Sequence, residues 1–452
     1  MKKFVRRSLL SLSAFVLIAS NAEAQSISAY QLWKMPSYLR GFDYRFDQSC
    51  NQQDILYRKT SGATIVNLST DGFLDMASPY DTVWGNVGAL DARVGYCDSA
   101  KVRYAIAVRR GPGRGDVYYQ KINQDPPSTV WKNSNQQKLY GSMLRWITSR
   151  YASDTLFVGI APTVEPNPFS DSLCCPDTTS MKEYFTRNGV DFTAIMQLWV
   201  DSIRAGSRSV PVLIQGPGYT NPDLFSLVPI VKDSFPVYEF HSYRPKFYAE
   251  DTTTNSVTYP GQYYNFVPFE LVTFDKAFIK DTVFRFINQI ARETGAPIFM
   301  GEFGLETQQF GGPQFLADLS SIAIENGWAF AYWMQDNSYF DYSQWGGEYW
   351  SAVLASLNPV NSGVDESNPD SGELIISQST NSGELSVYWP EADQSGLATQ
   401  VSIYDILGRH VRSMDETESH FLLELSGLRA GIYLLSLRSG QATAHALVRW
   451  IL

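Results

Sequence analysis

Cysteine and histidine are scarce in this chain of 452 residues, which contains four of each. The cysteines, Cys50, Cys97, Cys174 and Cys175, show no Cys-x-x-Cys spacing, and His241 is the one histidine between the N-terminal leader and residue 400. Zinc sites group such ligands at short spacings, so we predict no metal site. In an exported protein Cys50 and Cys97 could form a disulfide bond, whereas the adjacent pair cannot easily bond to itself.

Positive charge is also in short supply, since 36 lysines and arginines face 46 acidic residues and the net charge is −10. Nucleic-acid-binding proteins usually present a basic face, so we predict no nucleic-acid partner. The sequence lacks a Gly-x-Ser-x-Gly elbow, which speaks against an esterase or serine protease. Aromatic residues are plentiful, with 11 Trp, 26 Tyr and 26 Phe, and such rings suit an uncharged partner such as a sugar.

The N-terminus combines a basic start, an apolar run over residues 9–19 and the small-x-small sequence Ala22-Glu23-Ala24. This pattern is typical of a secretory signal peptide, which we assign to residues 1–24. The alternative, a membrane anchor, needs a longer apolar run. No cofactor is predicted from any motif in the chain.

Residues 25–357 repeat one rhythm, in which a short apolar run is followed by a longer amphipathic segment. The apolar runs cover residues 39–46, 62–70, 102–110, 155–166, 210–218, 235–245, 296–304 and 328–337, and helical segments include 136–151, 191–206, 274–295 and 313–327. Eight strands alternating with helices predict an α/β fold of the (β/α)8 TIM-barrel type. An open doubly wound sheet is the alternative, but no Gly-rich phosphate loop follows the first strand.

Composition changes after the barrel. Residues 358–372 are rich in Asn, Pro, Ser, Gly and acid, which is typical of a linker. Residues 373–452 contain alternating strands with Gly turns and predict a small β-sandwich. The phrases "VSIYDILGRHVR" and "LRAGIYLLSLRSG" resemble the C-terminal sorting domain of the type IX secretion system. The alternative is a carbohydrate-binding or immunoglobulin-like domain.

Two glutamates stand out among the polar residues at the ends of the barrel strands. Glu165 follows strand four and Glu302 follows strand seven, and these strands face each other across the mouth of such a barrel. Their carboxyl groups can then lie about 5 Å apart, the separation of a retaining glycosidase. His241 and Tyr243 on strand six can hydrogen-bond to both carboxylates, and Trp333 on strand eight provides a flat floor for a sugar ring.

These motifs together resemble glycoside hydrolase family 5, the cellulase and mannanase type, over residues 38–350. "PIFMGEFG" is similar to the family's nucleophile motif and "APTVEPNP" to its acid/base motif, so the resemblance implies Glu302 as nucleophile and Glu165 as acid/base. "EFHSYRP" and "AFAYWMQDN" match the strands that carry His241, Tyr243 and Trp333.

The chain departs from the family pattern at three places. Val164 stands where the family has the asparagine before the acid/base, Asn67 where it has an arginine on strand two, and Arg109 is the candidate to fill the place of a histidine on strand three. An arginine there can take over the binding of the nucleophile. The Gly-rich aromatic loop over residues 337–350 offers Trp345 as a further sugar platform or as a cap on the barrel.

The sequence therefore predicts a secreted retaining glycoside hydrolase that cleaves a β-linked polysaccharide without a metal or cofactor. The alternative is a non-catalytic glycan-binding barrel. The expected partners are the polysaccharide and the type IX secretion machinery, with the chain a monomer that passes through the periplasm of a Gram-negative bacterium to the outside or the cell surface. Gly301 and Gly304 beside Glu302 are expected to let the backbone turn and the sugar approach.

Overall fold

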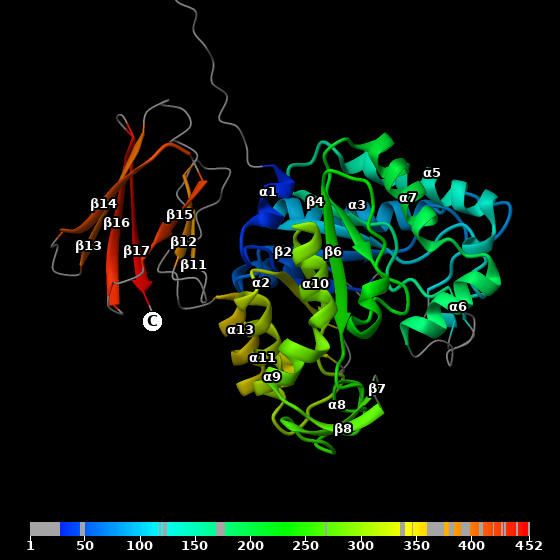
Figure 1. Cartoon of the computed structure of the whole chain (residues 1–452). Helices are drawn as coiled ribbons and strands as arrows, with labels where there is room; N and C mark the ends of the chain where they lie inside the picture. Colours follow the sequence, from blue (N-terminus) through cyan, green and yellow to red (C-terminus); the bar gives the residue numbers. More distant parts are fainter. Residues whose placement is uncertain are drawn as a thin grey trace, which may run out of the picture.

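A closed barrel of eight parallel strands forms the larger part of the computed structural model (Figure 1). The structure describes residues 28–358 except 46–49, 117–118, 121–123, 169–176, 267–268, 335–339 and 346, and in the C-terminal part the strands between 375 and 450 with a few neighbouring residues. The barrel strands are β1 (Arg40–Tyr44), β2 (Ile65–Thr70), β3 (Arg103–Val108), β4 (Phe157–Ala161), β5 (Val212–Gln215), β6 (Pro236–Ser242), β9 (Ile298–Phe303) and β10 (Ala329–Met334). Each lies within one of the eight predicted runs, so the TIM-barrel prediction is confirmed.

Helices surround the barrel and pack on its apolar outer face (Figure 1). The longer ones are α2 (Gln52–Thr60), α3 (Trp84–Ala100), α5 (Ser134–Tyr151), α6 (Thr178–Asn188), α7 (Phe192–Gly206), α10 (Arg285–Thr294), α11 (Gly312–Glu325) and α13 (Gly347–Leu357). Helices α5 and α7 pack closely, with the rings of Tyr140 and Trp199 4.5 Å apart. The predicted helix over 274–295 is interrupted by a π-helical turn at Ile279–Val283.

The inside of the barrel is apolar at its N-terminal end and polar toward its C-terminal end. The apolar inner residues include Ile65, Ala105, Ala107, Leu213, Val237, Phe299, Ala329 and Ala331. Helix α1 (Ala29–Lys34) closes this end: its Leu32 and Trp33 join the same cluster, and Trp33 Nε1 donates a hydrogen bond of 2.7 Å to the carbonyl oxygen of Val158. Functional side chains are therefore confined to the opposite end, as is general in this fold.

An antiparallel hairpin between β6 and β9 was absent from the sequence prediction. It consists of β7 (Gly261–Phe266) and β8 (Phe269–Phe274). Arg244, just after β6, holds the hairpin because its Nη2 donates to Asn265 Oδ1 at 2.9 Å. The barrel rhythm predicts only one strand and one helix per repeat, so an inserted hairpin has no place in that pattern.

The register between β6 and β9 shifts beside the predicted nucleophile. Phe240 pairs with Met300, but His241 pairs with Glu302, so Gly301 is passed over. Strict alternation would place Phe299 and Gly301 on the inner face and Glu302 on the outer face. The one-residue shift instead places Glu302 beside His241, while Met300 and Phe303 pack in the outer core. The direction of the Glu302 side chain thus depends on a backbone irregularity.

The C-terminal strands form two antiparallel sheets, as predicted for a small sandwich. One sheet contains β11 (Ile375–Gln378), β12 (Glu384–Tyr388) and β15 (His420–Glu424), and the other contains β14 (His410–Glu416), β13 (Thr399–Asp405), β16 (Gly431–Ser439) and β17 (Ala442–Trp450). Alternate residues such as Val387, Ile403 and Leu435 form its buried core.

Several predictions concern residues outside the described part of the chain. These are the signal peptide at 1–24, nearly all of the linker at 358–372, and Cys174 and Cys175. Cys50 and Cys97 are both described, and the structure does not join them in the disulfide bond that the sequence left possible. Within the described residues no helix has the length and apolar character needed to cross a membrane.

Candidate active site

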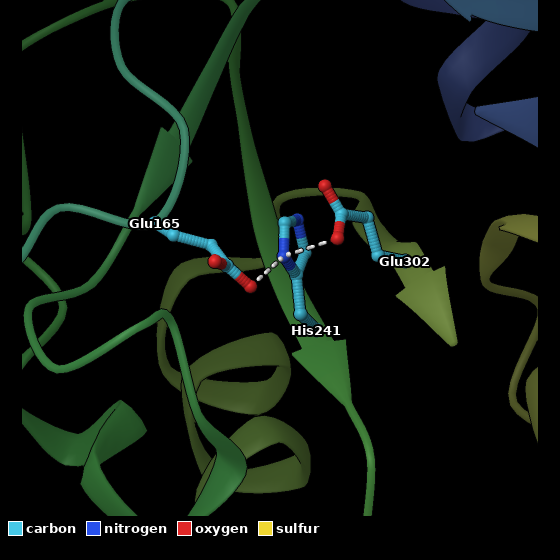
Figure 2. Close-up of side chains that lie close together, drawn as sticks. All are labelled: Glu165, His241 and Glu302. Carbon is cyan, nitrogen blue, oxygen red and sulfur yellow. Dashed lines mark hydrogen bonds and ion pairs between the residues drawn. The ribbon is translucent and has the colours of Figure 1, made fainter. Parts of the chain in front are cut away.

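Three elements bring Glu165, His241 and Glu302 together at the C-terminal end of the barrel (Figure 2). Glu302 lies on β9, His241 on β6, and Glu165 in the loop that follows β4. His241 Nδ1 lies 3.1 Å from Glu165 Oε1 and 3.4 Å from Glu302 Oε2. One carboxylate oxygen of Glu165, one of Glu302 and a ring nitrogen of His241 all lie within 4.8 Å of one another. The imidazole therefore bridges the two carboxylates.

The two glutamates differ in their exposure to water. The Glu302 side chain is 4% exposed, whereas that of Glu165 is 23% exposed. Glu165 also has an unusual backbone, with a φ of +47°, and its N–H donates to Gln215 Oε1 at 2.6 Å. A positive φ is uncommon for a residue with a side chain, and such strained residues cluster at functional sites. Gln215 on β5 thus fixes the loop that presents Glu165.

Arg109, just after β3, is the direct cationic partner of Glu302. Its Nη2 lies 2.7 Å from Glu302 Oε1, and its Nη1 lies 3.3 Å from Asp116 Oδ2. The third donor, Nε, bonds to the hydroxyl of Ser69 at 3.1 Å. This use of the planar guanidinium fixes the angle at which Arg109 meets the carboxylate.

Tyr243 and Trp333 complete the surroundings of Glu302. The Tyr243 hydroxyl donates to Glu302 Oε2 at 3.2 Å, so each Glu302 oxygen has a defined partner. The guanidinium carbon of Arg109 lies 5.1 Å from the centre of the Trp333 ring, within cation–π range. The structure thus places Arg109 and Tyr243 against the Glu302 carboxylate and Trp333 against Arg109, and all three residues were expected from the sequence.

Opposing effects set the protonation of this cluster. Burial raises the pKa of Glu302, and the nearby His241 and Arg109 cations oppose that rise. Burial by itself lowers the pKa of His241, but Glu302, Glu165 and Glu239 outweigh it and raise the pKa to about 10. Burial, with a contribution from Glu302, also holds the pKa of Asp43 well above its usual range. A cluster with such displaced pKa values is typical of an active site.

Asn67 is connected to this cluster by hydrogen bonds. It is buried on β2 and donates from Nδ2 to Asp43 Oδ2 at 2.6 Å. Asp43 Oδ1 accepts a hydrogen bond from Ser69 at 3.2 Å, and Ser69 in turn contacts Arg109. These hydrogen bonds thus connect Asn67 to the arginine through Asp43 and Ser69.

Val164 and Trp345 are placed by packing. Val164 is buried with the inner apolar residues, and its carbonyl oxygen accepts a hydrogen bond from Arg114 Nη2. Trp345 in helix α12 (Tyr342–Trp345) packs edge-on against Tyr342 and Tyr349, with ring centres 5.1 and 5.3 Å away. These contacts pack Trp345 among aromatic side chains, as expected if the loop caps the barrel.

Glycine is required on each side of Glu302 for a different reason from the one expected. A Cβ atom added to Gly301 would lie 2.1 Å from Glu239 Oε1, and one added to Gly304 would lie 1.9 Å from the hydroxyl oxygen of Tyr342. Both positions are therefore filled by side chains of the protein, and the expectation that they leave room for a sugar is corrected. Glycine is required at each because a neighbouring side chain packs against the backbone.

Sequence reasoning overlooked Glu239 and Asp116. Glu239 precedes His241 by two residues on the same strand, and the period of two predicts that both point to one face. Its Oε1 lies 3.4 Å from His241 Nε2. Asp116 lies in the loop after β3 and has no comparable pattern, because only the folded loop brings it to Arg109.

The spacing of Glu165, His241 and Glu302 also raises the question of a metal ion. Arg109 lies 2.7 Å from the same Glu302 carboxylate and repels any second cation there. His241, moreover, faces a carboxylate with each ring nitrogen, which favours N–H groups over the free lone pair that a metal requires. The donor set does not fit a metal centre.

Solved structures of two endoglucanases share this fold. A hyperthermophilic endo-β-1,4-glucanase solved with substrate aligns with a TM-score of 0.55 and 14% identity, covering 73% of this chain and 100% of that one. An endoglucanase of Thermotoga maritima aligns with a TM-score of 0.55 and 12% identity over 73% and 100% of the two chains. These similarities establish the class of fold.

Residues 34–339 match the model of the cellulases, glycosyl hydrolase family 5, and the chain belongs to that family. Residues 368–448 match the secretion system C-terminal sorting domain, so the tail is of the type IX sorting kind and supports secretion or attachment to the cell surface. Endoglucanase C of Acetivibrio thermocellus is 21% identical over 183 residues, or 38% of this chain. The chain spans about half, 46%, of that relative's length.

Proposed function

We propose that the chain is a secreted retaining glycoside hydrolase that cleaves within a β-linked polysaccharide of the β-glucan or mannan type. The observation that carries this proposal is the presence of carboxylate oxygens of Glu165 and Glu302 within 4.8 Å of each other. Retaining enzymes hold their two carboxyl groups about 5–5.5 Å apart, whereas inverting enzymes need about 6.5–9.5 Å to admit a water. The spacing here favours retention.

Glu302 acts as the nucleophile in this mechanism. It attacks the anomeric carbon while the bond to the leaving sugar breaks, and Glu165 gives its proton to the departing oxygen. Glu165 then takes a proton from water, whose oxygen attacks the same carbon and displaces Glu302. Two inversions return the original configuration at the anomeric carbon. The greater exposure of Glu165 suits a group that exchanges protons with water.

Neighbouring residues prepare the two glutamates for these roles. Arg109 and His241 oppose the effect of burial and favour the ionised Glu302 that attack requires. Tyr243 orients the second oxygen of Glu302. Trp333 offers its ring as the floor for the sugar, and Asn67 supports Arg109 through hydrogen bonds that pass by way of Asp43 and Ser69. Trp345 is proposed as a further platform for a sugar.

The proposed range of substrates is based on solved structures that share this fold. An endoglucanase of Thermotoga maritima with this fold has been solved with cellobiose and with mannotriose as substrates. A barrel of the same fold thus accepts both glucose and mannose units, and the assay panel should include β-1,4-glucan, mixed-linkage β-glucan and mannan. We further propose that the enzyme is a monomer and reaches the outside of a Gram-negative cell through the periplasm and the type IX machinery, which its sorting domain addresses.

Azide rescue tests the two roles separately. With an activated β-glycoside, Glu302→Ala plus azide is expected to yield the α-glycosyl azide, because azide replaces the nucleophile in a single inversion. Glu165→Ala plus azide is expected to yield the β-glycosyl azide, since the glycosyl-enzyme still forms. Glu306→Gln, which alters a partly buried glutamate four residues after Glu302, is the control and should retain activity. Full hydrolysis of a polysaccharide by either active-site variant without azide would contradict the assignment.

A second candidate function, glycan binding without cleavage, is favoured by one observation. Val164 and Asn67 stand at positions where the family has hydrogen-bonding partners for sugar or nucleophile, and Val164 is packed into the apolar core. This alternative predicts retention of the chain on an insoluble glucan or mannan with no new reducing ends. Release of reducing sugar that disappears in Glu302→Gln would exclude it.

A further inference from the structure

His241 is enclosed by carboxylates on both of its ring nitrogens. Nδ1 faces Glu165 at 3.1 Å and Glu302 at 3.4 Å, and Nε2 faces Glu239 Oε1 at 3.4 Å. An ionised carboxylate can only accept hydrogen bonds, and a neutral imidazole carries hydrogen on one nitrogen alone. All three contacts are favourable together when both nitrogens carry hydrogen. The neutral ring would point a lone pair at one of the acids.

Glu239 is a fully buried acid that no catalytic step described above uses. Its residue exposure is 0%, its Oε1 faces His241, and its Oε2 has no hydrogen-bond partner among the described residues. A buried carboxylate is retained in a protein when a cation or hydrogen-bond donors compensate for its lost hydration. The group that Glu239 Oε1 contacts is the His241 ring, and one residue of β6 separates the two residues.

The fold makes specific room for this acid. Gly301 is the residue passed over in the register between β6 and β9, and any larger residue there would collide with the Glu239 carboxylate. The same shift aims Glu302 at His241. The position of Glu239 and the direction of Glu302 therefore depend on one backbone irregularity, which is unexpected for an acid without a role.

We propose that Glu239 is a positioning residue that keeps His241 as an imidazolium, so that a permanent cation bridges the acid/base and the nucleophile. The catalytic consequence rests on the function proposed above, but the protonation of His241 can be measured whether or not the chain hydrolyses a glycan.

The other titratable groups around His241 are consistent with this assignment. Glu165 comes from the β4 loop, Glu302 from β9, Asp43 from β1 and Arg109 from β3. Arg109 forms its ion pairs with Glu302 and Asp116. The surrounding carboxylates raise the pKa of His241 to about 10 against the effect of burial. His241 is thus the cation available to Glu239.

A fixed imidazolium has a defined effect on the two glutamates. It can donate from Nδ1 toward both Glu165 and Glu302 at every pH at which the enzyme works, and it adds a positive charge that favours ionised Glu302. A histidine with its ordinary pKa of about 6.5 would lose that charge within the working range. Glu239 thereby removes a titration that would otherwise appear in the pH dependence of the reaction.

Nuclear magnetic resonance of the full chain tests the proposal directly. Histidines labelled with 13C and 15N give four signals, and loss of one signal in His241→Gln identifies His241. In the parent we expect imidazolium chemical shifts that do not titrate between about pH 5 and 8.5. In Glu239→Gln we expect the signal to titrate within that range. Glu183→Gln, at an exposed position on α6, is the matched control and should behave as the parent.

Three results would overturn the proposal. A neutral His241 at pH 7 in the parent chain would refute it without the Glu239→Gln variant, so the test does not depend on the folding of that variant. An unshifted imidazolium in folded Glu239→Gln would show that Glu239 is not the group that holds the proton. For catalysis we expect kcat/KM of Glu239→Gln to fall on the order of a hundredfold, as misplaced catalytic groups cause, and to gain a new pH limb. If His241 titrates in that variant but kcat/KM and its pH profile match Glu183→Gln, the positioning role is refuted.

Discussion

Replacing Arg109 by methionine is the most direct test of how this site keeps its nucleophile ionised. Arg109 lies 2.7 Å from Glu302 with side-chain exposures of 8% and 4%, so water screens the pair little. Two unit charges about 4 Å apart interact by about 4 kcal/mol at an effective dielectric constant of about 20. If that interaction is lost from the reacting state, kcat/KM falls about a thousandfold.

The direction of the pH effect follows from the causes of the Glu302 pKa. Burial raises it, and Arg109 and His241 oppose the rise. Without Arg109 the nucleophile requires a higher pH to ionise, so the acidic limb of kcat/KM moves to higher pH. Breaking one partner of a buried ion pair also destabilises a fold by about 3–5 kcal/mol, which thermal unfolding will report.

Arg110 provides the matched control for this experiment. It is the next residue, and its ion pairs are with Asp71 at 3.0 Å and Asp125 at 2.6 Å. Arg110→Met therefore removes an arginine and its ion pairs from the same loop without touching Glu302. We expect it to lose stability but to keep the parent's acidic limb. A folded Arg109→Met with an unmoved acidic limb and near-parental kcat/KM would refute this account of the nucleophile.

Two further predictions concern stability. Gly301→Ala places a methyl group 2.1 Å from Glu239 Oε1 and should lower the free energy of unfolding by about 1–3 kcal/mol in urea titrations. Gly88→Ala on α3, where no atom lies within 4 Å of the added Cβ, is the control and should be neutral or stabilising. Equal losses of stability in the two variants would contradict the packing argument. The pKa of His241 is raised to about 10 in the folded chain from an ordinary value of 6.5. Its contribution to the free energy of unfolding is therefore complete below about pH 6.5 and is progressively lost as the pH rises toward 10. Urea unfolding at pH 6, 8 and 10 should show the free energy of unfolding falling with pH in the parent and in the exposed-site control His410→Gln. The fall should be much weaker in His241→Gln. The same pH dependence in all three proteins would refute the contribution of His241.

Much of the barrel was predictable because its signals are local. Each strand is a short apolar run bounded by turn residues, and helices such as α5, α7 and α11 begin and end within about two residues of their predicted limits. The family resemblance was also accessible, since it depends on motifs that stay in order along the chain, and residues 34–339 match the family model. The inserted hairpin was missed because nothing in the repeat predicts an extra pair of strands.

The site shows where local signals end. Sequence placed Glu165 and Glu302 at strand ends, and their order along the chain predicted that they would meet. Tertiary structure alone decided that the register shift at Gly301 turns Glu302 inward and that the Glu165 backbone adopts a positive φ. Both features arise from pairing and packing with residues distant in the sequence, so no window of neighbouring residues contains them.

The partners of the two glutamates divide in the same way. Residue types alone determined that an arginine at 109 and a histidine at 241 were available as cations near the mouth of a barrel. The fold decided that Arg109 meets Glu302 and Asp116 together, and that His241 lies between three acids, one of them the buried Glu239. The physical reason is that charge is compensated in three dimensions: a buried acid needs a cation within a few ångströms in space, and the chain is free to supply it from any strand.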